Sequence, residues 1–60
     1  MHAYIIHTMT EDEEVLYVGN VDWETMDVVW EENPELAGIF YPEEVDELEE
    51  LYDYLVVEEV

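Results

Sequence analysis

The chain has 60 residues, with 19 Asp and Glu, no Lys or Arg, and a formal net charge of −19. It has no Cys, which excludes disulfide bonds, and half of its residues are hydrophobic, which indicates one folded domain over residues 1–60 rather than a disordered chain. So large a negative charge excludes nucleic acid and anionic lipid as direct partners, because their phosphates repel carboxylates.

The first third of the chain predicts two antiparallel strands. Residues 3–7, AYIIH, are rich in β-branched and aromatic residues and apolar on both faces, as in a central strand. Residues 10–13 form a polar turn, and residues 14–18 form a second strand that ends at Gly19 and Asn20. The short separation between the two strands favours a hairpin.

Residues 22–32, DWETMDVVWEE, are open to two interpretations. As a helix, the segment would be capped by Asp22. As a strand, residues 26–30 are rich in β-forming side chains, and we favour this interpretation. Either element must end at Asn33, because Pro34 disfavours a helical conformation in the residue before it.

The second half of the chain predicts a helix between two shorter elements. Residues 34–38 fit one helical turn, residues 42–55 a long helix that begins at Pro42, and residues 56–60 a final strand at a sheet edge. The predicted fold class is therefore α+β. It consists of a small antiparallel sheet of three to four strands with one C-terminal acidic helix packed on it, in the order β-β-β-α-β.

The predicted helix has one apolar stripe and one strongly acidic face. The stripe consists of Val45, Leu48, Leu51, Tyr52 and Leu55. Carboxylates four residues apart on the other face are about 6 Å apart along the axis, which is the scale of successive phosphates along a strand. Because no cation offsets this charge, the pattern indicates a use for negative potential outside the fold. The candidate partner-binding residues on the helix are Glu43, Asp46, Glu47, Glu49, Glu50 and Asp53, and a second contact is the turn Glu11, Asp12, Glu13 and Glu14.

The order of these features resembles small α+β proteins encoded in phage genomes and mobile elements. The resemblance rests on the YII and YVG strands, Trp30, Ala37, Phe40, and the acidic PEEV helix followed by VVEE. The acidity is similar to that of DNA-mimic proteins, a functional class that includes inhibitors of restriction enzymes, uracil-DNA glycosylase, CRISPR effectors and nucleoid proteins. This resemblance implies an inhibitor that occupies the basic nucleic-acid-binding surface of such a protein in the cytoplasm of a host cell.

Other kinds of chemistry find little support in the sequence. The chain has no Ser, Cys or Lys and no triad pattern, so we expect no enzyme activity and no cofactor. The acidic turn lacks the spacing of a calcium-binding loop, and His2 and His7 would lie on opposite faces of a strand, so we expect no specific metal site.

The aromatic residues divide into two groups. Trp30, Phe40 and Tyr17 are expected in the core and Tyr52 beneath the helix. The other three aromatic residues considered lie next to carboxylates, where an exposed ring can stack on an arginine of a partner: Trp23, Tyr41 and Tyr54.

The sequence is also compatible with three alternatives to DNA mimicry. The acidity can be an adaptation to high salt in a structural domain. The protein can be an adaptor that binds a host protein through an apolar sheet face, where Trp23 or Tyr4 would matter more than the helix acids. That same face can form a homodimer, because one helix cannot cover both faces of a sheet.

Overall fold

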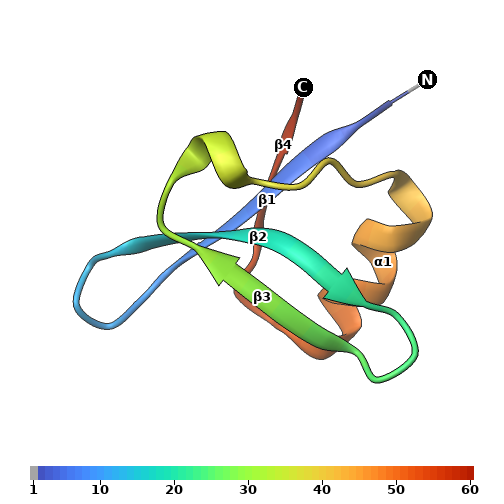
Figure 1. Ribbon diagram of the computed structural model, residues 1–60, viewed down its shortest axis with the longest axis horizontal. Coiled ribbons are helices and arrows are strands. Elements are labelled where there is room, and N and C mark those ends of the chain that lie inside the picture. The colour runs from blue at the N-terminus through green and yellow to red at the C-terminus, as the bar shows by residue number, and fades with distance from the viewer. Residues whose placement is uncertain (1) are drawn as a thin grey trace.

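A computed structural model describes residues 2–60. Its elements are β1 (Tyr4–Met9), β2 (Val15–Asp22), β3 (Asp27–Glu31), the 3-10 helix η1 (Pro34–Leu36), α1 (Pro42–Leu51) and β4 (Val56–Glu59) (Figure 1). The strands form one antiparallel sheet in the order β3-β2-β1-β4. The predicted α+β fold and its element order are confirmed, with β1 inside the sheet and β4 at an edge.

A tight acidic turn joins β1 to β2. The backbone N–H of Thr10 donates to the carbonyl of Glu14 (2.8 Å), and that of Glu13 donates to the carbonyl of Thr10 (3.0 Å). Glu13 has a left-handed conformation, with φ of 65°. This is the geometry of a three-residue hairpin loop that ends in a left-handed residue, and it places Glu11, Asp12 and Glu13 at the tip.

Residues 22–32 contain the turn of the β2–β3 hairpin and the strand β3, so the strand interpretation is right and the helix alternative is wrong. Asp22 pairs with Asp27 across the hairpin, and its carboxylate accepts a hydrogen bond from the N–H of Glu24 (3.0 Å). The N–H of Met26, a residue with φ of 61°, donates to the carbonyl of Asp22 (2.6 Å). Asp22 thus closes a turn, not a helix, because its bonds return the chain to β3.

The predicted end of the second strand at Gly19 and Asn20 is wrong, because β2 continues to Asp22. The pairing with β3 shifts register between Val18 and Asn20, which marks a β-bulge at Gly19. A glycine within a strand pattern indicates either a strand end or such a bulge.

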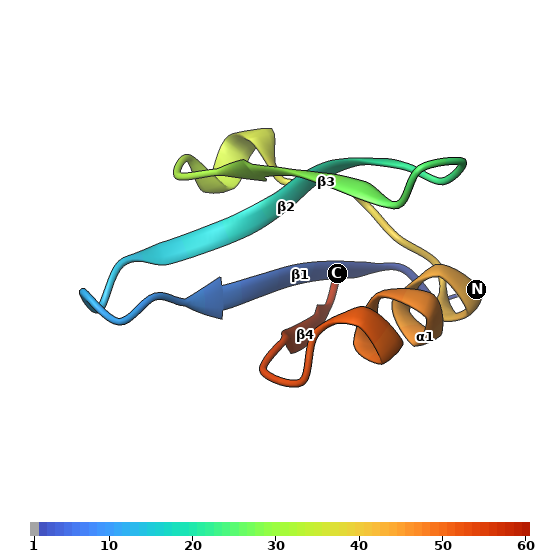
Figure 2. The same cartoon turned by 90° about the horizontal axis from the view of Figure 1, so that it is seen from below.

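The linker after η1 passes between β2 and the beginning of β1. The N–H of Gly38 donates to the carbonyl of Val18 (2.9 Å), while Phe40 exchanges two backbone hydrogen bonds of 2.8 Å with Tyr4. Figure 2 shows the consequence: η1 lies beside β2 and β3, α1 lies beside β1 and β4, and the segment that joins them crosses between β1 and β2.

Helix α1 is shorter than predicted. It begins at Pro42, as expected, and the Glu44 carboxylate accepts a hydrogen bond from the N–H of Tyr41 (3.0 Å). It ends at Leu51 rather than Leu55, because Tyr52 has extended backbone angles (φ −130°, ψ 129°). No cation stabilises the last turn, and the Tyr52 and Trp30 rings meet edge to face at a centroid distance of 5.5 Å.

The core lies between α1 and one face of the sheet. Its buried residues are Ile6, Val18, Val21, Phe40, Val45 and Leu48. Leu51, which the helical stripe placed in the core, is 49% exposed. Tyr17 is also outside this core, since strand alternation directs it to the opposite face, where its ring lies 5.6 Å from that of His7.

The opposite face of the sheet is covered by η1 only near Gly19 and is otherwise open. Alternation along the paired strands places these residues there: Ile5, His7, Met9, Val15, Tyr17, Val29 and Val56. Met9 is 62% exposed and Val29 is 52% exposed. The prediction that one helix leaves an apolar sheet face uncovered is therefore confirmed for this part of the sheet.

Candidate partner-binding site

The outward side of α1 is a continuous acidic surface. With 100° between successive residues, the four carboxylates that point most directly away from the buried Val45 and Leu48 are Glu43, Asp46, Glu47 and Glu50. All four are exposed, and Glu49 is exposed at the side of the helix. The structure thus brings together five of the six predicted helix residues, and we call these five the α1 acidic face.

The charge density of α1 lies between those of single-stranded and double-stranded DNA. With Glu44 included, the 10-residue helix carries six carboxylates over about 15 Å, or about one per 2.5 Å. One DNA strand carries a charge about every 3.4 Å and the duplex about every 1.7 Å of axis. The whole chain, with 19 carboxylates over a longest extent of 31 Å, has about one per 1.6 Å, which is close to the duplex value.

The carboxylates of the α1 acidic face make no side-chain hydrogen bond to any of residues 2–60, whereas Glu44 does. The Glu44 carboxylate binds the N–H of Tyr41 and is only partly exposed, so it stabilises the helix start. The remaining helix acids have no such role within the fold. They are available to an external cation.

Asp53 does not belong to this acidic face. It was expected on the same helix, but the helix ends two residues earlier and Asp53 lies exposed in the turn that leads to β4. The prediction of a helical position for Asp53 is therefore wrong. Asp53 is instead flanked in the sequence by Tyr52 and Tyr54.

The second predicted contact, the Glu11–Glu14 turn, lies at the other end of the molecule. Figures 1 and 2 both show the β1–β2 hairpin tip and α1 at opposite ends of the longest axis, which measures 31 Å. All four acids of the turn are exposed. The two acidic patches are therefore separate, and a partner that touches both must extend along most of the molecule.

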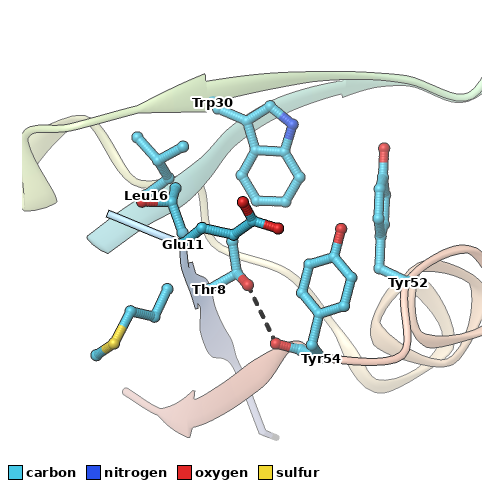
Figure 3. A pocket seen from close by; sticks show the side chains of 8 residues that line it. Thr8, Glu11, Leu16, Trp30, Tyr52 and Tyr54 are labelled. Atoms are coloured by element: carbon cyan, nitrogen blue, oxygen red, sulfur yellow. Dashed lines mark hydrogen bonds between the residues drawn. The ribbon is translucent and has the colours of Figure 1, made fainter. Parts of the chain in front are cut away.

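A pocket of about 540 Å³ lies between these two patches (Figure 3). Its lining comes from the β1–β2 hairpin, from β3 and from the segment after α1: Thr8, Met9, Thr10, Glu11, Leu16, Trp30, Tyr52 and Tyr54. The buried Thr8 hydroxyl donates to the carbonyl of Tyr54 (3.1 Å), which fixes the segment after α1 against β1. We call this site the aromatic pocket.

The aromatic pocket was not predicted from the sequence. Tyr54 was expected to be exposed beside carboxylates, as it is, but Trp30 was assigned to the core and Tyr52 to the underside of the helix. Trp30 does pack against the core while also lining the pocket. The early helix end brings Tyr52 and Tyr54 to this site, and the only sequence signal for it is the lack of a favourable helix C-terminus after Leu51.

The two histidines have different surroundings. His2 lies 2.7 Å from the Glu59 carboxylate, while His7 lies on the open sheet face with its Nδ1 buried and without a hydrogen bond. Residues 2–60 contain no group of three or more His, Asp or Glu side chains that could hold a metal ion. Among the helices of the described chain, none is both long and apolar enough to span a membrane.

Comparisons with protein-family models, with curated proteins and with solved structures find no match to this chain.

Proposed function

We propose that this protein is a DNA mimic that occupies the basic nucleic-acid-binding surface of a bacterial defence or DNA-binding protein in the cytoplasm of a host cell. The target would be a restriction, CRISPR, repair-glycosylase or nucleoid protein. The observation that carries the proposal is the α1 acidic face, an exposed row of carboxylates at nearly the charge density of DNA, in a chain without a single Lys or Arg. The protein would act by binding alone, without catalysis or a cofactor.

The mechanism follows from the way in which proteins bind nucleic acid. A DNA-binding surface presents Lys and Arg side chains that pair with phosphates and release counterions. Carboxylates spaced along α1 can pair with the same side chains, and arginine binds a carboxylate with two parallel hydrogen bonds. Because the mimic and DNA would need the same cations, binding of one would exclude the other.

The test is an affinity capture from bacterial lysate with the whole protein as bait, at 0.15 and 0.5 M salt. Each captured protein is then challenged with duplex DNA. The proposal predicts a basic nucleic-acid-binding protein that is retained at the lower salt, weakened at the higher salt and released by DNA. A captured partner that DNA does not release would contradict DNA mimicry.

A second candidate function is supported by the open sheet face. An adaptor would bind a host protein through the apolar residues there, such as Met9 and Val29, and its acidity would only maintain solubility. A substitution of Tyr4 does not test this function. Tyr4 precedes the buried Ile6 by two residues in β1, so both side chains lie on the α1 side of the sheet. Substituting both Met9 and Val29 with Thr would abolish partner capture by an adaptor but not by a DNA mimic.

The same open face could join two copies of the chain. Self-association would bring together two chains of −19 each, or −38 in total, so it would require high salt to screen the repulsion. Sedimentation at 0.05 and 1 M NaCl separates the cases, since a dimer through this face would form at the higher salt and be removed by the Met9 and Val29 substitutions.

A further inference from the structure

Three rings line the aromatic pocket, and that of Tyr52 packs against both of the others. The Trp30 and Tyr52 rings are 5.5 Å apart and nearly perpendicular (81°), and those of Tyr52 and Tyr54 are 6.3 Å apart at 66°. Figure 3 shows these three side chains around the pocket together with Glu11. Tyr54 is 63% exposed, so this wall is accessible from solvent.

Rings and a carboxylate together favour a cation. The faces of aromatic rings carry partial negative charge and attract cations, most strongly for Trp. Glu11 adds a full negative charge to the lining. The chain has no Lys or Arg of its own to occupy this site, so the cation must come from another molecule.

We propose that the aromatic pocket binds the guanidinium group of an arginine side chain that a partner protein inserts between the β1–β2 hairpin and the segment after α1. The pocket's size lies within the range of about 300–1,000 Å³ that is usual for small-ligand sites. The apolar side chain of Leu16 in its lining suits the aliphatic part of an arginine side chain.

The hydrogen-bonding groups favour arginine over other organic cations. A guanidinium is planar, stacks on aromatic rings and offers N–H donors in a fork that matches a carboxylate such as that of Glu11. The oxygens of the Thr8 and Thr10 hydroxyls can each accept a further N–H, because Thr8 only donates, to the Tyr54 carbonyl, and Thr10 accepts a single hydrogen bond, from the N–H of Glu14. A quaternary ammonium has no N–H to donate to Glu11, and a lysine ammonium cannot stack as a plane.

This assignment goes beyond DNA mimicry. Imitating a phosphate lattice requires only carboxylates, whereas the aromatic pocket selects one side chain by shape and stacking. The pocket lies between the α1 acidic face and the hairpin tip, so an arginine anchored there would fix the register of a partner that touches both. The two proposals fail separately, because the experiment below uses no partner protein and no DNA.

The experiment is an NMR titration of the whole ¹⁵N-labelled protein with N-acetyl-arginine amide. The signal to follow is the indole N–H of Trp30, and that of Trp23, which does not line the pocket, is the internal control. We expect a saturable shift of the Trp30 signal with a Kd of about 1–10 mM, corresponding to a single anchored side chain, and little change at Trp23. An unsaturable shift, or equal shifts of both indoles, would overturn the assignment.

Two further probes test the choice of cation. N-acetyl-lysine amide has the same charge as the arginine probe, and tetramethylammonium has the charge without donors. We expect both to bind at least about threefold more weakly, because each loses either stacking or the hydrogen bonds to Glu11. Equal affinity for the lysine probe would overturn the assignment to arginine, because general electrostatic attraction would then explain the binding. Tighter binding of tetramethylammonium would also overturn it and would indicate a site for a methylated ammonium.

Matched variants locate the site. Glu11→Gln should weaken the arginine probe at least about threefold, whereas Glu35→Gln, which removes the same charge outside the pocket, should have a smaller effect. Tyr54→Leu should also weaken it, whereas Tyr41→Leu, at another exposed tyrosine, should not. Circular dichroism would verify that each variant is folded. Equal effects of a pocket variant and its control would overturn the proposal.

Discussion

The backbone N–H of Gly38 donates a hydrogen bond to the carbonyl of Val18 (2.9 Å) at the point where β2 separates from β1. The strands β1 and β2 pair only from His7 to Met9, so β2 lacks a β1 partner beyond Tyr17. The N–H of Gly38 provides the hydrogen bond that the Val18 carbonyl would otherwise lack there. The linker continues from Gly38 through the sheet to α1. The position of the α1 acidic face thus depends on this contact.

Gly38→Ala is expected to destabilise the protein by about 1–3 kcal/mol, the usual cost of overpacking. An added Cβ would lie 2.5 Å from the Gly19 carbonyl oxygen. The Cβ is fixed to the linker backbone and the oxygen to the β2 backbone, and neither backbone can move independently of the sheet. The measurement is the free energy of unfolding in urea.

The control for this prediction is Gly19→Ala. The closest atom to a Cβ at Gly19 is the Glu31 Cγ at 2.6 Å, which belongs to a flexible side chain, while the nearest backbone atoms are 3.4 Å away. The Glu31 side chain can rotate away, so this variant should lose less stability than Gly38→Ala. The reverse order would contradict the close passage of the linker against β2.

Leu48→Ala and Leu51→Ala should differ sharply, although both residues belong to the same predicted helical stripe. Leu48 is fully buried (0% exposed), and truncating such a residue costs about 2–5 kcal/mol. A core of this size rarely provides more than about 3–5 kcal/mol, so the Leu48→Ala protein should be largely unfolded at 25 °C. Leu51 is exposed, and its truncation should change the stability by about 0.5 kcal/mol or less. Similar losses, measured by thermal unfolding, would contradict the observed helix packing.

The sequence predicts the elements better than it predicts their ends. Runs of β-branched and aromatic residues indicated the strands, and the 3.6-residue spacing of apolar residues indicated the helix, because that spacing follows directly from the burial of one face. This spacing extended α1 to Leu55, since Leu51 and Leu55 fit the stripe, whereas the contacts that end the helix, Trp30 with Tyr52 and Thr8 with Tyr54, join residues distant in sequence.

The sequence predicts one part of the candidate site and not the other. The α1 acidic face could be predicted, because helical spacing alone determines which carboxylates share a face. The aromatic pocket could not, because its lining combines Glu11, Trp30 and Tyr54 from three separate segments. Only the paired register of the strands and the early helix end bring these residues together.

Stability should rise with salt and then level off. The −19 charge repels itself within a molecule of 10.8 Å radius of gyration, a length comparable to the screening length of about 10 Å at 0.1 M salt. Screening is nearly complete at about 1 M, where that length is about 3 Å. We therefore expect the Tm to rise between 0.02 and 0.5 M NaCl and to change little above 1 M. A steep rise that continues into molar salt would instead support the high-salt adaptation.

Reversing Glu47 and Glu50 to Lys should weaken partner binding while leaving the fold intact or more stable. Each new cation would stand four residues after an acid, Glu43 or Asp46, in the orientation that stabilises a helix. On the surface that faces a basic partner, however, each reversal replaces an attraction with a repulsion. Together they should reduce affinity at least about tenfold, which corresponds to about 1.4 kcal/mol. Isothermal titration against the captured target measures the affinity, and thermal unfolding measures the stability.

The control for this reversal is the double variant Glu32→Lys and Glu35→Lys, which makes the same change in net charge at and next to η1, away from α1 (Figure 1). If the α1 acidic face contacts the target, the control should lose much less affinity than the helix variant, because it changes only the long-range attraction. Equal losses would mean that net charge alone governs binding, and unchanged affinity of the helix variant would exclude α1 as the contact. A loss of affinity together with a higher Tm would show that the carboxylates at 47 and 50 serve the partner at the expense of the fold.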